Sequence, residues 1–143
     1  MVNTYDHPAH PSDNGVIGRE QLKWLDSDLH FASSAGQKIA VMLHHNPFDD
    51  RWIFMDEGRE QLVEVLERHG ARYVFAGHRH SDQLEQTELT KIITTRTAQA
   101  ASRDMAGYRV IRIEDGYIAS VHYMMPKSSK PLGTTNMGPE AEG

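Results

Sequence analysis

The sequence of 143 residues contains no cysteine, so disulfide bonds and thiolate metal ligands are excluded. No apolar run approaches the ~20 residues that a membrane-spanning helix needs, and the N-terminus lacks the charged-then-apolar pattern of a signal peptide. Acidic residues outnumber lysine and arginine by 20 to 15, and the net charge of −5 gives no basic surface typical of nucleic-acid binding. These absences do not determine the cellular compartment of the protein, and we slightly favour the cytoplasm.

The length suits one domain, large enough to bury about two thirds of the surface of its unfolded chain. The last stretch, Pro126–Gly143, has almost no apolar residues and is expected to be disordered. We therefore predict a folded domain over residues 1–125 and a disordered tail over residues 126–143.

Two apolar runs with a helical pattern between them form the centre of the chain. Ile39–Leu43 and Tyr73–Ala76 are rich in residues that favour buried strands. The intervening Gly58–His69 has apolar residues at helical spacing and is followed by Gly70, a plausible left-handed cap. This order predicts a βαβ unit with parallel strands and a right-handed crossover.

Histidines follow both predicted strands. His44 and His45 come after the first strand, and His78 and His80 come after the second. Parallel strands bring their carboxyl ends to one edge of the sheet, which is where open α/β sheets bind ligands. Neutral imidazole is a common ligand for divalent metals, so the pattern indicates a metal site; solvated loop histidines are the alternative.

The flanking segments complete an α/β prediction. Gly18–Ala32 has an apolar stripe at helical spacing and is predicted to be a covering helix. Lys91–Thr97 is β-branched and predicts a strand. Tyr108–Ile113 and Tyr117–Tyr123 flank Asp115-Gly116, a two-residue hairpin signal, and predict antiparallel strands that extend or close the sheet.

These motifs resemble the C-terminal half of the calcineurin-like metallophosphoesterases. The resemblance rests on HHNPF at His44–Phe48, on GHRH at Gly77–His80 and on the helical GVIGREQLKWLDSDL at Gly15–Leu29, and it runs from about Val2 to Tyr123. It implies an α/β fold: half of a β-sandwich flanked by helices, in which a parallel βαβ unit is followed by antiparallel strands.

The N-terminal motifs of that family are absent from this sequence. It has no Gly-Asp-x-x-Asp and no Gly-Asn-His followed by Asp or Glu. Its single Asp-x-His, Asp28-Leu29-His30, falls in a predicted helix, where the motif needs the end of a strand. We therefore interpret the chain as the C-terminal portion of a metallophosphoesterase domain, whose N-terminal half is missing or supplied by a separate chain or a homodimeric partner.

The resemblance implies roles for the histidines. His44 and His78 would bind one ion of a divalent pair of Mn, Fe or Zn, and His80 would bind the other. His44 is preferred to His45 because it directly follows the apolar run. The catalytic residues remain unidentified.

Three further residues are predicted to bind the phosphoester substrate: His45, Arg51 and Arg79. Arg51 lies in a long connection after the first strand, where an arginine can bind a phosphate oxygen. A structural salt bridge is the equal alternative for Arg51.

The predicted function is metal-dependent hydrolysis of a small-molecule phosphoester, with this chain supplying the later histidine ligands and a recognition loop. The alternative is a non-catalytic metal-binding or scaffold module, or a subunit completed by a separate N-terminal chain. No nucleic-acid partner and no membrane segment are expected.

Overall fold

A computed structural model describes residues 2, 14–49, 55–98, 106–124 and 133–136. The chain divides into two compact units. The first comprises Met1–His78 with Asp82–Thr94, and the second comprises Arg79–Ser81 with Thr95–Gly143.

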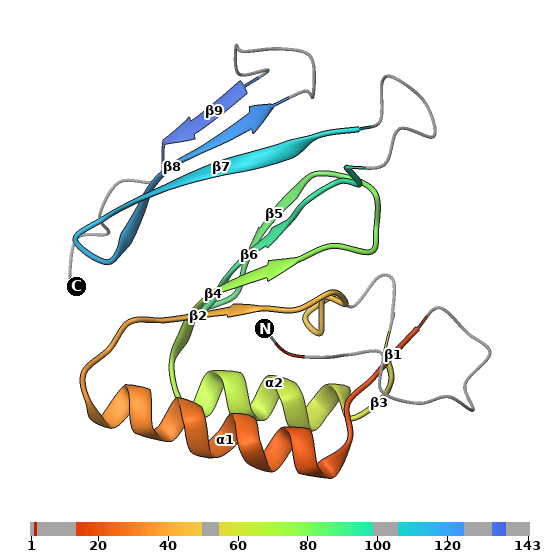
Figure 1. The fold of residues 1–143 in the computed structure, drawn as a ribbon, viewed down its shortest axis with the longest axis vertical. Coiled ribbons are helices and arrows are strands. Elements are labelled where there is room, and N and C mark those ends of the chain that lie inside the picture. The colour runs from red at the N-terminus through yellow and green to blue at the C-terminus, as the bar shows by residue number, and fades with distance from the viewer. Residues whose placement is uncertain (1, 3–13, 50–54, 99–105, 125–132, 137–143) are drawn as a thin grey trace. The chain divides into compact units, whose positions relative to one another are not determined.

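The first unit is built on a mixed four-stranded sheet. Its strands are β2 (Ile39–Met42), β4 (Ala71–Ala76), β6 (Lys91–Thr94) and β5 (Gln83–Gln86), in the order β2-β4-β6-β5 (Figure 1). β2, β4 and β6 are parallel, and β5 pairs antiparallel with β6. The predicted parallel strand pair is confirmed, although β6 ends at Thr94 rather than Thr97.

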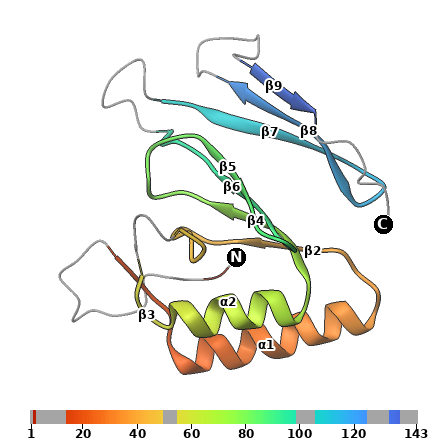
Figure 2. The same cartoon turned by 180° about the vertical axis from the view of Figure 1, so that it is seen from behind.

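Two helices cover one face of this sheet. α1 (Arg19–Ser34) and α2 (Arg59–Arg68) lie side by side next to β2 and β4 in both views (Figure 1 and Figure 2). Both were expected from the helical spacing of their apolar residues. Gly70 follows α2 with φ of 66°, as its predicted role as a left-handed cap requires. Neither helix is long and apolar enough to cross a membrane, among the residues that the structure describes.

The core of the first unit lies between the helices and the sheet. Its most buried members are the α2 residues Leu62 and Leu66 and the β4 residue Val74, each with an exposed fraction of 0%. Burying one such side chain contributes about 1.5–3 kcal/mol, so this layer is the main source of stability for the unit.

The motif Asp28-Leu29-His30 lies within α1, as its helical context predicted. Leu29 is buried in the core, while Asp28 and His30 are exposed. The Asp-x-His motif of the metallophosphoesterases needs the end of a strand, so the location agrees with our interpretation of this match as a coincidence.

A small two-stranded sheet joins the segment before α1 to the segment before α2. β1 (Gly15–Val16) pairs in parallel with β3 (Met55–Glu57). Asn14 Nδ2 donates a hydrogen bond to Asp56 Oδ1 at 2.8 Å. The sequence did not predict these strands, because two or three residues are too few for a periodic pattern.

The second unit contains a three-stranded antiparallel sheet in the order β7-β8-β9. β7 (Tyr108–Glu114) and β8 (Tyr117–Met124) form the predicted hairpin, with positive φ at Asp115 (51°) and Gly116 (77°). This pattern of φ angles is the one that a type I′ turn requires. Among the described residues these strands form a sheet of their own, so the prediction that they extend the sheet of the βαβ unit is not confirmed.

β9 (Gly133–Asn136) differs from the sequence prediction. It lies inside the stretch 126–143 that was expected to be disordered, and it pairs with Ser120–Tyr123 of β8. Its two central residues are threonines, which favour strands, and pairing satisfies backbone groups of β8 that β7 does not. The rest of the predicted tail lies outside the described residues.

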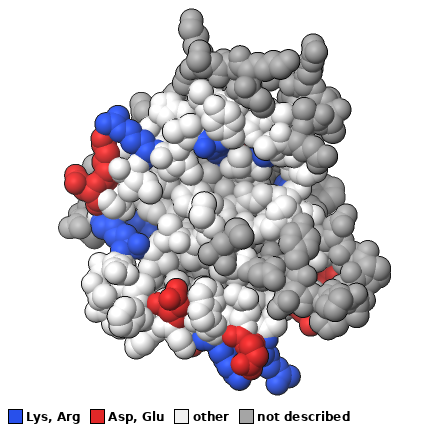
Figure 3. All heavy atoms as spheres, in the orientation of Figure 1, with Lys and Arg blue, Asp and Glu red and all other residues white. Residues whose placement is uncertain are grey.

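Several charged side chains on the helices form ion pairs. Acidic and basic side chains are intermixed along the lower margin of Figure 3, and Lys23 Nζ lies 2.9 Å from Glu20 Oε1 on α1. Exposed pairs of this kind contribute little to stability, typically 0–1 kcal/mol.

One cluster links the two helices. At the end of α2, His69 Nε2 lies 2.7 Å from Asp26 Oδ1 of α1, and Arg68 Nη1 lies 3.1 Å from the same oxygen. The pKa of Asp26 is lowered, first by the hydrogen bond with His69 and further by the positive charges of Arg68 and His69. His69 therefore has a structural role, as its position at the end of a helix suggested.

We predict that Asp26→Asn destabilises the chain at pH 7 and that this difference shrinks in acid. Because the pKa of Asp26 is depressed in the folded state, its contribution is present above the ordinary carboxyl pKa of about 4 and is lost as the pH falls through the lower folded value. Urea unfolding of both proteins between pH 7 and pH 3.5 measures the difference.

Asp28→Asn is the matched control, since Asp28 is an exposed aspartate on the same helix. We expect it to change stability little at either pH. A difference between Asp26→Asn and the unchanged chain that stays constant across this range would contradict the prediction.

Candidate metal centre

The pairing of β2 with β4 continues beyond the ends of both strands. Leu43 N donates a hydrogen bond to Phe75 O at 3.0 Å, and Gly77 N donates one to His44 O at 2.9 Å. His44 is therefore held by the backbone at the level of Gly77, immediately before His78. This register brings the histidines of two distant segments to one edge of the sheet, as parallel pairing predicted.

Three imidazoles meet at this edge. His44, His45 and His78 each offer one ring nitrogen, and these three atoms lie within 4.8 Å of one another. His78 Nδ1 and His44 Nε2 are 3.3 Å apart, and the centroids of the three rings are 4.6–5.2 Å apart. His45 is fully buried, while His44 and His78 are half-buried.

The spacing suits a divalent metal. Zinc–imidazole bonds of about 2.0–2.1 Å place two nitrogens of a tetrahedral site roughly 3.3–3.4 Å apart, and the His78–His44 separation is 3.3 Å. A hydrogen bond between two imidazoles explains that distance equally well, but it does not account for a third ring converging on the pair. Three neutral imidazoles match the nitrogen ligands that zinc and other borderline metals prefer.

Thr94 adds a buried polar group at the same edge. It ends β6 and pairs in register with Ala76, two residues before His78. Its Oγ1 is buried and, among the described residues, has no hydrogen-bond partner. A buried hydroxyl without a partner costs free energy, so a bound water or ligand at this edge would stabilise it.

His78 adopts a strained backbone conformation. Its φ is 62°, in the left-handed region that costs a residue with a side chain roughly 1–2 kcal/mol. Histidine visits this region more often than most residues do. Such strain persists only where surrounding interactions hold it, and it is concentrated at functional sites.

The turn after β2 is fixed by Asn46. Its Oδ1 accepts a hydrogen bond from Phe48 N at 2.9 Å, and its Nδ2 donates one to Glu85 Oε2 of β5 at 3.0 Å. Pro47 between them is buried and has a restricted φ. The HHNPF turn is thus anchored on the sheet, which limits the freedom of the two histidines that precede it.

Gly15 of β1 packs directly against His45. A Cβ atom at this position would lie 2.5 Å from His45 Nδ1 and 2.8 Å from His45 Cγ. Real Cβ atoms do not make contacts this short with any heavy atom, so only glycine allows the backbone of β1 to approach the buried ring so closely. The segment before α1 therefore helps to position a candidate ligand.

The predicted site residues have different outcomes. His44 and His78 meet as predicted, and His45, which was assigned to the substrate, lies in the same cluster. The geometry therefore does not distinguish His44 from His45 as a metal ligand. Treating both histidines as residues at the end of the strand would have included His45 among the predicted ligands.

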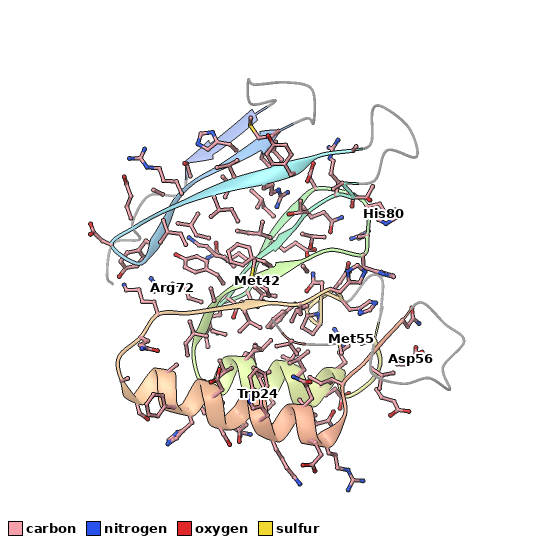
Figure 4. The ribbon with its side chains drawn as sticks, in the orientation of Figure 1. Trp24, Met42, Met55, Asp56, Arg72 and His80 are labelled. Carbon is pink, nitrogen blue, oxygen red and sulfur yellow. The ribbon has the colours of Figure 1, made fainter. Side chains whose placement is uncertain are left out.

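The other three predicted site residues lie elsewhere in the chain. His80 and Arg79 belong to the second unit; His80 is exposed, has φ of 51° and lies in the connection between β4 and β5 (Figure 4). Arg51 lies outside the described residues. The roles of these three residues stay predictions.

Comparison with curated proteins identifies relatives of two kinds. Over 71 residues, 46% of this chain, the sequence is 41% identical to "Probable cyclic nucleotide phosphodiesterase SynWH7803_1390" of Synechococcus sp. (strain WH7803), of which it covers 27%. Over 124 residues, 80% of this chain, it is 27% identical to "Serine/threonine-protein phosphatase CPPED1" of Mus musculus and 24% identical to that of Rattus norvegicus, covering 40% of each.

No protein-family model matches the chain. The chain spans between about a quarter and two fifths of the length of the curated relatives it matches. Both kinds of relative are phosphoester hydrolases by name, and the similarity supports a relationship of the aligned part to the metallophosphoesterase superfamily.

We predict that the isolated chain binds Zn²⁺ or Mn²⁺ through this cluster. His44→Ala and His78→Asn should each weaken the affinity at least about tenfold, because even the loss of a group that only supports a metal ligand typically costs that much. Asparagine is chosen at residue 78 because it tolerates the left-handed conformation. Isothermal titration calorimetry at pH 7.5 provides the measurement.

His30→Ala is the control, since His30 is an exposed histidine of α1 outside the cluster. Binding should weaken below about pH 6, because protons compete for imidazole nitrogens. Equal affinity in the unchanged chain and in both cluster variants would contradict the assignment.

A second prediction concerns the close contact of Gly15. Gly15→Ala should lower the free energy of unfolding by about 1–3 kcal/mol, the usual cost of overpacking, and weaken metal binding because the ring of His45 must move. Gly18→Ala is the matched control, because no atom lies within 4 Å of its added Cβ. Similar stability of the two variants in urea would show that β1 does not constrain His45.

Proposed function

We propose that this chain is part of a metal-dependent phosphoester hydrolase and supplies histidine ligands to its metal centre. The observation that supports the proposal is the convergence of His44, His45 and His78, with nitrogens within 4.8 Å, at the carboxyl edge of a parallel strand pair. The names of the related proteins favour phosphoester hydrolysis over other metal-dependent reactions.

The residues of the cluster would hold one divalent ion. A bound ion of this kind neutralises phosphoryl oxygens and lowers the pKa of bound water. Imidazole ligands are neutral, so the three histidines leave the full charge of the ion available to an anionic substrate. The buried His45 and the anchored HHNPF turn keep these ligands pre-organised, which reduces the reorganisation needed on binding.

The proposal also includes a second metal ion next to the first. His80 would be a ligand of this second ion. Two dications about 3.5–4 Å apart need carboxylates to neutralise and bridge them. The sequence lacks the acidic motifs that supply such groups in the metallophosphoesterases, so they would come from an N-terminal portion or from a partner chain.

The substrate class remains a proposal as well. The relatives are named for cyclic nucleotides and for phosphorylated serine or threonine, both of which are phosphoesters. Arg51 and Arg79 would bind phosphate oxygens, because a guanidinium group matches their geometry. Binding of a phosphate group by Arg51 and Arg79 would suit a small-molecule phosphoester and a phosphoprotein equally.

The alternative is a metal-binding module without catalytic activity. The absence of Gly-Asp-x-x-Asp and Gly-Asn-His from the sequence favours it for the chain by itself. The two functions differ in what happens when the acidic motifs are restored, since only a true half of an enzyme then gains activity.

We predict that the purified chain with Mn²⁺ hydrolyses bis(p-nitrophenyl) phosphate no faster than metal alone. General acid catalysis is typically worth 10²–10⁴ in rate, and the groups for it and for the second metal are missing. Complementation with a separate N-terminal segment designed to bear Asp-x-His, Gly-Asp-x-x-Asp and Gly-Asn-His should restore turnover.

Two variants make this experiment specific. His44→Ala should abolish the restored turnover and metal binding, whereas His80→Ala should abolish turnover and remove only one equivalent of metal. Complemented protein that binds two metals but remains inactive would favour the non-catalytic alternative. Rapid turnover by the chain alone, lost in His78→Asn, would show that its own carboxylates complete the site.

A further inference from the structure

A groove runs along the outer face of α2 in the first unit. It is lined by residues of three segments: Pro47 and Phe48 after β2, Thr87 of the β5–β6 turn, and Arg59, Glu60, Val63, Glu64 and Glu67 of α2. Its volume of about 510 Å³ is within the range of roughly 300–1,000 Å³ that is usual for ligand sites.

The floor and the wall of the groove differ in chemistry. Pro47, Phe48 and Val63 form an apolar floor and are buried or half-buried. The exposed wall consists of the glutamates at residues 60, 64 and 67, which share one helix face because they are four and three residues apart. With Arg59 as the single cation in the lining, the groove has a net charge of −2 from three carboxylates and one guanidinium.

The carboxylates at the two ends of the wall are available to a ligand. Glu64 is paired with Arg68 at 2.6 Å. Glu60 and Glu67 form no ion pair with any residue in the described part of the chain. The groove therefore attracts cations at both ends and offers an apolar surface between them.

The spacing of these two carboxylates selects an extended peptide. A helical rise of 1.5 Å per residue places Glu60 and Glu67 about 10 Å apart along α2. A polyproline II chain is extended, has three residues per turn and advances about 3.1 Å per residue, so two basic side chains three positions apart lie on one face and span nearly the same distance. The apolar side chains between them project to the two flanking faces, one of which would lie over Phe48 and Val63.

We propose that this groove binds an extended basic peptide segment of a partner protein, with basic residues three positions apart and apolar residues between them. The groove begins at Pro47 and Phe48, which directly follow the histidine-bearing turn. One end of a peptide docked in it would lie next to the turn that carries His44 and His45. The binding itself requires neither a metal nor hydrolytic activity.

Fluorescence anisotropy tests the proposal with a labelled Gly-Ser-Arg-Leu-Val-Arg-Ser-Gly peptide in low salt. We expect saturable binding, weakened about three- to tenfold by Glu60→Gln/Glu67→Gln, since exposed ion pairs contribute modestly. Val63→Ser should weaken peptide binding further, because it replaces apolar surface on the floor of the groove with a hydroxyl group. A peptide with both arginines replaced by glutamate should not bind, and one with the arginines adjacent should bind more weakly.

Glu20→Gln/Asp28→Asn is the control, because it removes the same charge from exposed positions of α1 outside the groove. It should change the affinity less than twofold. Equal losses in the two double variants, or equal binding of the two arginine peptides, would indicate non-specific attraction and overturn the proposal. Absence of saturable binding would overturn it as well.

Discussion

The hydrogen bond from Gly77 N to His44 O fixes the geometry on which the candidate site depends. It extends the parallel register of β2 and β4 by one step past the strands, so the two histidine-bearing turns start at the same level. A slip of one residue would turn every side chain of β2 to the opposite face and separate His44 from His78. The buried core residues Val41 and Val74, which are partners in this register, make such a slip costly.

Local strain at the site is balanced by packing around it. His78 is held at φ of 62°, and His45 is fully buried against the backbone of Gly15. Neither arrangement is favourable by itself, because left-handed backbone and buried imidazole both cost free energy. The anchored HHNPF turn and the core beneath it supply the compensation, which is the usual relation between a rigid scaffold and a strained site.

The sequence was most informative where a structural signal is local. The apolar runs of β2 and β4, the helical stripe of α2 and the Asp115-Gly116 turn each determine their own conformation, and all were predicted. β5 (Gln83–Gln86) was missed because its residues are mostly polar and become a strand only by pairing with β6. The contact of Gly15 with His45 was missed for a related reason: it joins segments 30 residues apart that share no pattern. The meeting of His44 and His78 could be predicted because strand direction determines it. The inclusion of His45 depends on side-chain packing that no sequence pattern encodes, and the predicted role of His80 stays a prediction.

The charge of the ligand set limits what the cluster can bind alone. Three neutral imidazoles suit one divalent ion, because they coordinate it without cancelling its charge. A second ion about 4 Å away would meet an electrostatic repulsion that only bridging anions relieve. A phosphoester is itself such an anion, but it binds transiently, so a stable metal pair requires carboxylates from elsewhere in the protein. Occupation of the proposed second position would therefore depend on a source of such carboxylates. The proposed first position involves only His44, His45 and His78 of this chain, so its affinity would report on the fold of this chain alone.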